Sequence, residues 1–254
     1  MARIHNGPVY LEPIEHVYIH KETGEKFTSV TKVIGLIEQP FASDDIATAI
    51  SRQPNSKKNP AYVGLSKGDI LDLWQRENDE ANHYGSMVHE IVEDYLMANK
   101  FYFPKNDFEA AVIAAYEELK LDEGRELFPE RIMFSAEFKL AGMTDLLVDV
   151  DDELFDIGDW KTNKAFNYYS KYKTWLLPPF EYLQDCQYTI YSLQLSIYAL
   201  MYEMESGKKC RHLWAAHFNK ETLKFQKIPI MYMKHEAKKL LKLHEYQTKL
   251  NQAS

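Results

Sequence analysis

The middle of the chain carries three consecutive runs typical of β-strands, near residues 131–140, 144–150 and 154–161. Helical periodicity precedes them at about 68–99 and 106–121, and a long helix follows at about 183–206. A strand pair at about 211–229 and a lysine-rich amphipathic helix from about 234 complete the pattern. Because helices on both sides of a strand group cover both faces of one sheet, this order predicts an α/β fold with a mixed central β-sheet flanked by helices.

The N-terminal part predicts additions to that core. The stretch "HVYIHKETGEKFTSVTKVIGLI" alternates polar and apolar residues around a Thr-Gly turn and then offers Ser29 as a helix N-cap, which predicts a hairpin followed by a helix. Residues 52–67 are polar, basic and broken by proline, and are expected to form a loop or a mobile lid. We expect one domain over residues 1–254, with an N-terminal helical and loop region up to about residue 80.

Composition limits the class of protein. A chain of 254 residues with 45% hydrophobic content can bury a large core, and its net charge of -8 argues only weakly against nucleic-acid binding. Two cysteines are too few for a cysteine-rich zinc site or a four-thiolate iron–sulfur cluster. No phosphate-binding GxxxxGK[ST] or dinucleotide-binding GxGxxG segment occurs. The sequence also lacks a signal-peptide core and an 18-residue apolar run, so we expect a cytoplasmic protein with no membrane partner.

A pair of acidic strands predicts a metal site. Period-2 alternation places Asp159 and Lys161 on one face of the strand at 154–161, and a three-residue Asp-Asp-Glu turn would set Asp145 opposite Asp159. Two carboxylates about 5 Å apart repel each other unless a cation lies between them, and oxygen ligands suit Mg²⁺. Lys161 could help to deprotonate a metal-bound water or neutralise charge on a phosphate. The alternative is an exposed hairpin with a surface ion pair.

A histidine on the helix at 68–99 is the second candidate. Gly85, His89 and Glu93 recur every four residues and so share one helix face, at the margin of a buried stripe. A neutral imidazole can complete the coordination of a metal held by carboxylates, although a histidine at such a margin is more often structural. Glu137 is expected on the preceding strand, either as a further ligand or supporting acid, or on the solvent side of an edge strand.

The helix at about 183–206 carries amides and phenols on one face. These are Gln187, Tyr191, Gln194 and Tyr198. Such groups can steady a catalytic residue, and tyrosines can stack on bases. The alternative is a core helix whose tyrosine hydroxyls are satisfied at its edge.

Four segments, "GSMVHEIVE", "EFKLAGMTD", "GDWKT" and "YSLQLSIYALMYE", together resemble the motifs of the RecB-like branch of PD-(D/E)XK nucleases, in the same order. The region that carries them runs from about residue 85 to 203, and "FTSVTKVIG" looks like a helix start common in stand-alone members. The resemblance implies a restriction-endonuclease-like fold and hydrolysis of phosphodiester bonds with Mg²⁺ or Mn²⁺.

Roles for individual residues follow from this resemblance. The positions matching metal ligands are His89, Asp145, Asp159 and the carbonyl of Trp160. The positions matching catalytic residues are Lys161, Asp159, Asp145 and Glu93. The positions matching supporting or DNA-binding residues are Glu137, Gln194 and Tyr198, and we add Thr162 and Lys164 just after the strand.

The departures from the family refine the expected function. Several relatives hold an iron–sulfur cluster with four cysteines, which the two cysteines here cannot supply, and the helicase half of RecB-type machines is absent. The resemblance is thus to stand-alone phage or mitochondrial exonucleases. We expect a metal-dependent deoxyribonuclease, an exonuclease acting on single-stranded DNA or duplex ends in recombination, replication or repair, in a bacterial or phage-infected cell. A separate helicase, single-strand-binding or annealing protein would be its partner. The alternatives are a structure-specific endonuclease and a non-catalytic nuclease-like DNA-binding module.

Overall fold

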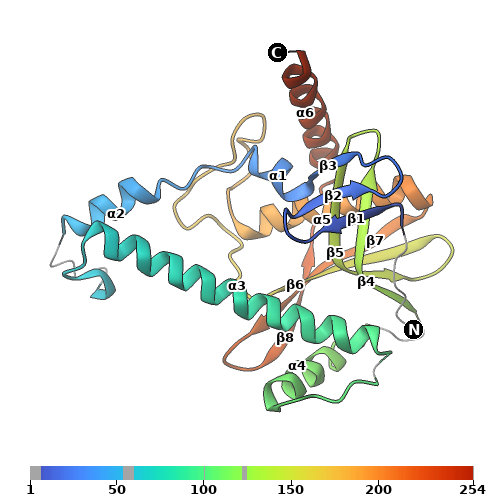
Figure 1. Cartoon of the computed structure of the whole chain (residues 1–254), viewed down its shortest axis with the longest axis horizontal. Helices are drawn as coiled ribbons and strands as arrows, with labels where there is room; N and C mark the ends of the chain where they lie inside the picture. The colour runs from blue at the N-terminus through green and yellow to red at the C-terminus, as the bar shows by residue number, and fades with distance from the viewer. Residues whose placement is uncertain (1–6, 54–59, 100, 122–124, 254) are drawn as a thin grey trace.

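A mixed sheet of eight strands forms the centre of the computed structural model, which describes residues 7–53, 60–99, 101–121 and 125–253 (Figure 1). The strands are β1 (Val9–Glu12), β2 (Val17–His20), β3 (Lys26–Ser29), β4 (Glu126–Ser135), β5 (Leu140–Asp149), β6 (Leu154–Lys161), β7 (Lys209–Asn219) and β8 (Lys224–Ile230). Their order is β1-β2-β3-β5-β6-β7-β8, with β4 paired to β5 as well. The β3–β5 and β6–β7 pairs are parallel and the others antiparallel, so the predicted mixed sheet is confirmed.

Helices cover both faces of this sheet (Figure 1). They are α1 (Val30–Gly35), α2 (Ser43–Ser51), α3 (Lys67–Met97), α4 (Asp107–Glu117), α5 (Gln187–Ser206) and α6 (Lys234–Ala253), with a 3-10 turn η1 (Pro60–Tyr62). On one face, Phe155 and Ile157 of β6 pack in a core shared with α1, α5 and α6. On the other, Trp160 of β6 packs in a core shared with α3 and α4. Side chains of β6 therefore alternate between two hydrophobic cores, one on each face of the sheet.

The N-terminal hairpin and helix form as the sequence predicts. β2 and β3 pair antiparallel, and the Ser29 hydroxyl accepts a hydrogen bond from the Lys32 amide at the start of α1. A further strand, β1, pairs with β2 and was not predicted. The centre of the basic loop predicted at 52–67, residues 54–59, lies outside the described residues.

Two predicted element boundaries are wrong. The strand predicted at 131–140 ends at Ser135, and the chain turns through residues 136–139 before β5 begins at Leu140. Lys139 closes this turn with a φ of 49°, in the left-handed region that a sequence normally marks with glycine or asparagine. Similarly, α5 begins at Gln187 rather than near 183, because Gln184 forms an isolated β-bridge with Trp175 and Cys186, with extended backbone, is the N-cap.

One edge of β5 is shared by two strands that do not meet. β4 pairs along one whole edge of β5, so β3 and β6 both pair with the other edge. β3 pairs at Leu140 and Ala141, whereas β6 pairs from Leu146 onward. Residues 142–145 of β5 therefore have no strand partner on that edge, and the sheet opens there. We call this four-residue stretch the β5 gap.

The first half of α3 extends away from the sheet with α2 beside it (Figure 1). Within α3 the buried side chains are Ile70 and then none until Val88, from which point the helix packs on the sheet. The Ser66 hydroxyl and the Asp69 carboxylate cap its start reciprocally. The helix therefore joins a projecting arm to the body of the protein. None of the described helices is long and apolar enough to cross a membrane.

Candidate active site

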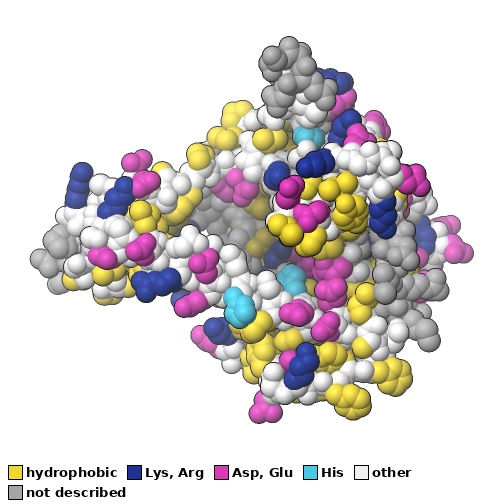
Figure 2. Space-filling view, in the orientation of Figure 1, with side chains coloured by type: hydrophobic (Ala, Val, Ile, Leu, Met, Phe, Trp, Pro, Cys, Tyr) yellow, Lys and Arg dark blue, Asp and Glu magenta, His cyan; other side chains and the backbone are white. Residues whose placement is uncertain are grey.

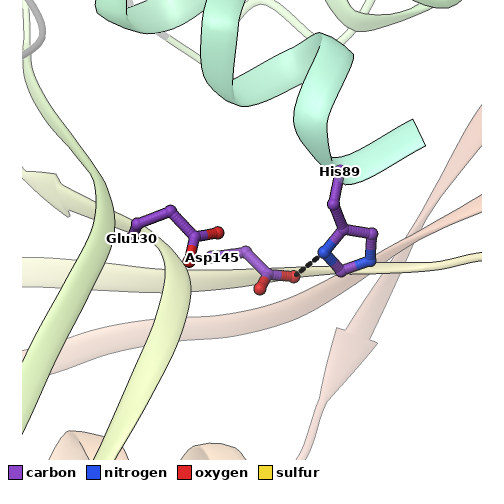
Figure 3. A group of neighbouring side chains, drawn as sticks. All are labelled: His89, Glu130 and Asp145. Atoms are coloured by element: carbon purple, nitrogen blue, oxygen red, sulfur yellow. Dashed lines mark ion pairs between the residues drawn. The ribbon is translucent and has the colours of Figure 1, made fainter. Parts of the chain in front are cut away.

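Three side chains from three elements converge beside the β5 gap. His89 comes from α3, Glu130 from β4 and Asp145 from β5, and one donor atom of each lies within 4.8 Å of the other two (Figure 3). Acidic side chains gather on the surface where the arm meets the body, next to a hollow (Figure 2). His89 and Asp145, both named above as candidate metal ligands, therefore lie close together, with Glu130 beside them.

The local structure explains how each side chain reaches this point. Val88 and Val92 on α3 are fully buried, which turns His89 to the margin of the helix and toward the sheet. Glu130 lies opposite Asp145 in the β4–β5 register, between the pairs Pro129–Leu146 and Arg131–Thr144. Its φ of 49° is uncommon for a residue with a Cβ, so the strand is locally distorted where it presents this carboxylate.

Asp145 is the central residue of the group. The β5–β6 ladder ends at the pair Leu146–Gly158, so one further step places Asp145 opposite Asp159, as predicted. Beyond this pair, a side chain on β5 takes the place of a backbone acceptor. Asp145 Oδ2 accepts a hydrogen bond of 2.6 Å from the backbone amide of Trp160. The same Oδ2 lies 3.5 Å from His89 Nδ1. These contacts fix the orientation of the Asp145 side chain in the opening of the sheet.

Asp159 and Lys161 form an ion pair on the adjacent strand, β6, as the shared strand face predicts. The Oδ2 atom of Asp159 is buried and, within the described part of the chain, has no partner besides the Lys161 ammonium. The ring of Tyr191, from α5, lies 4.4 Å from Lys161 Nζ, which adds a cation–π contact. The Lys161 ammonium is thus held between a carboxylate and an aromatic face.

Burial and the neighbouring charges shift the pKa values of the clustered side chains. Burial would lower the pKa of His89, but the charges of Asp145 and Asp159 raise it to about 9. Burial, followed by the charge of Asp145, raises the pKa of Glu130 to about 8. Burial also opposes ionisation of Asp145, yet His89 and Lys161 hold its pKa below the usual range. For Lys161, burial favours the neutral amine, but Asp159 and Asp145 outweigh it and raise the ammonium pKa.

The side chains present fit a divalent cation. Four carboxylates, those of Glu93, Glu130, Asp145 and Asp159, interact electrostatically in this region with one lysine and one histidine. Burial and the Asp145 charge raise the pKa of Asp159, which is the repulsion that a bound cation would relieve. Carboxylate oxygens with one imidazole are ligands suited to Mg²⁺ or Mn²⁺.

The amide and phenol helix packs against the same opening. Gln194 Nε2 donates to the Tyr198 hydroxyl over 3.2 Å, and Tyr198 is almost fully buried. A Cβ placed on Gly142, within the β5 gap, would lie 2.5 Å from Tyr198 Cε1, so only glycine fits there. Tyr198 of α5 therefore packs directly beneath the β5 gap, with Gln194 hydrogen-bonded to it.

No protein-family model and no curated protein matches the sequence. Among solved structures, the chain is similar to a protein from Eubacterium rectale that is provisionally named as an exonuclease, with a TM-score of 0.41 and 16% sequence identity. The similarity covers 65% of this chain and 65% of the length of that protein. A similarity of this size carries neither fold nor function to this chain.

Residues predicted next to the core of the site take several positions. Burial and then the charges of neighbouring acids, Asp145 among them, raise the pKa of Glu93, which lies one turn after His89 on α3. The Trp160 indole is buried in the core, and the backbone amide of Trp160 donates a hydrogen bond to Asp145. A Cβ on Gly85 would lie 3.0 Å from the Thr162 hydroxyl, so α3 approaches the end of β6 closely there. Lys164 is exposed and lines a separate cleft with Thr162.

The structure does not bring Glu137 to this site. Glu137 was expected on a strand, but it is exposed in the turn between β4 and β5 and lines a cavity with residues of α5 and α6. Glu130, seven residues earlier in the sequence, holds the position beside Asp145. Sequence reasoning missed it because no turn signal marks residues 136–139, and without that turn the register of β4 against β5 cannot be placed.

Proposed function

We propose that this protein is a nuclease that hydrolyses phosphodiester bonds in DNA with the help of Mg²⁺ or Mn²⁺. The observation that carries the proposal is the convergence of His89, Glu130 and Asp145 beside the Asp159–Lys161 ion pair, in an opening of the sheet. Acids, an imidazole and an ammonium in one partly buried cluster are the groups needed to hold a cation and a phosphate together.

The order of these residues along the chain supports the same proposal. His89, Asp145, Asp159 with Lys161, and Gln194 with Tyr198 belong to the four segments that resemble RecB-like nuclease motifs. Residues far apart in that order lie around one opening, which a chance match of four short segments would not require. The fold, a mixed sheet covered by helices on both faces, suits such an enzyme.

Each side chain has a distinct part in the proposed reaction. His89, Glu130, Asp145 and Asp159 would hold the cation, with the carbonyl of Trp160 as a further candidate ligand. A divalent cation bound there would lower the pKa of a water and neutralise charge on the phosphate. Lys161, fixed by Asp159 and the Tyr191 ring, would place its positive charge beside the phosphate oxygens as negative charge develops on them. Glu93 would orient a water near these ligands.

The test is cleavage of end-labelled single-stranded and duplex DNA with Mg²⁺, with Mn²⁺ and with EDTA. We expect products only with a cation, and none from the Asp159→Ala variant. Degradation that is unaffected by EDTA, or an Asp159→Ala variant as active as the wild type, would contradict the proposal. We further propose an exonuclease, which predicts that a circular single strand survives while its linear form is degraded.

A further inference from the structure

The end of β6 and the first part of the connection to α5 form a positively charged segment. Residues 161–173, "KTNKAFNYYSKYK", contain four lysines and no acidic residue, in a chain whose net charge is -8. We call residues 161–173 the tyrosine–lysine loop. It begins at Lys161, the lysine of the candidate active site. A positive segment that leads directly out of this site offers favourable electrostatics for the phosphates of a nucleic acid.

Two aromatic rings of this loop stand in solvent. Tyr169 is 76% exposed and Tyr172 is 77% exposed, whereas Phe166 is turned inward, with its ring centroid 5.6 Å from that of Tyr191. Lys171 Nζ lies 5.8 Å from the centroid of the Tyr172 ring. Exposing two large rings close together in sequence has no stabilising effect on the fold. Such rings can stack on unpaired bases, and neighbouring lysines can contact the phosphates.

The backbone that presents these rings is held in place by α5 and the segment before it. The Ser170 amide donates to Gln184 Oε1 over 2.9 Å, and the Asn167 amide donates to Gln187 Oε1 over 2.8 Å. The Ser170 and Thr174 hydroxyls lie 2.7 Å apart and share a hydrogen bond. Side-chain amides thus fix the backbone of a polar loop and leave its two outer tyrosine rings exposed. A ring platform prepared in this way loses little conformational entropy when a base stacks on it.

A cleft beside the rings extends to Tyr191, the residue whose ring contacts Lys161. Its volume is about 470 Å³, and Tyr169, Lys171, Tyr172 and Tyr191 are among the residues that line it. Tyr191 is the link, because its ring contacts Lys161 Nζ and its hydroxyl donates to Asn163 Oδ1 over 2.9 Å. Glu38 and Asp185 also line the cleft. Their negative charge would repel phosphates, so a strand would direct its backbone toward the lysines and its bases toward the tyrosines.

We propose that the tyrosine–lysine loop binds a single nucleic-acid strand and guides it to Lys161, with bases stacked on Tyr169 and Tyr172 and phosphates near Lys171 and Lys173. This inference rests on the proposed nuclease function and deepens it: the substrate at the site is an unpaired strand. Paired bases in a duplex have both faces covered by their neighbours, so they cannot use the rings.

The experiment measures binding separately from cleavage. Fluorescently labelled oligo(dT), oligo(U) and a duplex of the same length are titrated with the full chain in EDTA, and the dissociation constant is read from anisotropy. We expect at least one of the two single strands to bind more tightly than the duplex. The double variant Tyr169→Ala/Tyr172→Ala should weaken that binding by about 30-fold or more, since two stacked bases are lost. The oligo(dT) and oligo(U) arms show whether DNA or RNA is preferred.

Matched variants make the result decisive. Tyr246, 63% exposed on α6, is a tyrosine outside the loop, and Tyr246→Ala should bind as the wild type does. Lys171→Gln/Lys173→Gln should reduce the slope of log affinity against log salt by about 0.7 for each phosphate that is no longer neutralised by a lysine. Wild-type affinity in the double tyrosine variant, or equal affinity for duplex and single strands, overturns the proposal. Hydrolysis of bis(p-nitrophenyl) phosphate with Mn²⁺ reports the nuclease chemistry independently of the loop.

Discussion

Two acid–base ion pairs lie three residues apart on β6, on opposite faces of the sheet. In one, both oxygens of Asp156 are bound: Oδ1 accepts from Arg211 Nε at 2.9 Å and from the His212 amide at 3.1 Å, and Oδ2 accepts from Arg211 Nη2 at 2.6 Å. In the other, Asp159 Oδ2 faces only Lys161 within the described residues, and the carboxyl groups of Asp145 and Glu130 lie nearby.

The difference separates a self-contained structural ion pair from the ion pair of the proposed active site. The Asp156–Arg211 pair is complete, with one positive group matched to one carboxylate and every short contact made within the protein. The Asp159–Lys161 pair belongs to a cluster in which carboxylates outnumber cationic groups, so it can still accept a cation. Both acids belong to the stretch "DIGDWK", in which strand alternation and the family resemblance already single out Asp159, and the structure adds how different their surroundings are.

After the complete loss of cleavage expected in Asp159→Ala, the largest effect is expected at Lys161. Lys161→Ala should lower the rate of DNA cleavage by about 100- to 1,000-fold, because the developing charge on phosphate loses a preorganised partner. Single-turnover cleavage measures the rate, and circular dichroism checks the fold. The matched control is Lys208→Ala, which removes another lysine paired to an aspartate, Asp149, at 2.5 Å on the far end of β5. Comparable losses in both variants would contradict the assignment.

The next-largest effect concerns metal binding, which should depend on the acids around the Asp159–Lys161 pair and not on the Asp156–Arg211 pair. A saturating concentration of Mn²⁺, about 100 times its dissociation constant, should raise the unfolding free energy of the wild type by about 2.7 kcal/mol. Asp145→Asn should abolish this stabilisation because it removes a charged ligand, whereas Arg211→Ala should keep it. Thermal unfolding with and without Mn²⁺ gives both values. Equal stabilisation in the Asp145→Asn variant would exclude Asp145 as a ligand.

For the Asp156–Arg211 pair we expect the opposite: its loss should lower stability and leave cleavage unchanged. Arg211→Ala leaves the buried Asp156 carboxylate without its bidentate partner and should lower the unfolding free energy by about 2 kcal/mol. Urea denaturation measures that loss. Cleavage per folded molecule should stay at the wild-type level, and a selective loss of activity would show that the comparison between the two pairs fails.

The smallest effect is expected from a comparison of Glu130 with Glu137, which tests which of the two glutamates supports the metal site. Glu130→Gln should lower the cleavage rate by at least about tenfold, a loss similar to that seen when groups supporting a metal site are removed. Glu137→Gln should leave the rate unchanged, because that side chain is exposed in the turn after β4. Initial rates over a range of Mn²⁺ concentrations provide the measurement. Activity that falls in Glu137→Gln and stays intact in Glu130→Gln would reverse the two roles.

Short-range rules account for most of the fold and for part of the site. The Asp-Asp-Glu turn sets the β5–β6 register, because Asp151 Oδ1 accepts hydrogen bonds from the Glu153 and Leu154 amides. That register is enough to place Asp145 opposite Asp159. Helix periodicity likewise places His89 at the margin of its helix, next to buried valines. In each case the deciding interaction lies within a few residues along the chain.

The parts that could not be predicted depend on distant contacts. Glu130 joins the site only through the β4–β5 register, and the turn that sets this register closes at Lys139, a residue with no left-handed preference. The β5 gap needs β3 and β6, more than 120 residues apart in the sequence, to pair with one edge of the same strand. No local pattern encodes such an arrangement, since it results from the packing of α1 and α5 beneath it.

The gap in the β5 edge also has a consequence for the order in which the protein opens. β3 is joined to β5 by two residue pairs, whereas β4 is joined to it along the whole strand. Local separation of the N-terminal hairpin therefore needs far less free energy than global unfolding, and its amides should exchange hydrogen with solvent before those of β4. Glu130, Asp145 and Asp159 lie on β4, β5 and β6, beyond that boundary. The proposed catalytic centre would therefore keep these three strands when the hairpin separates.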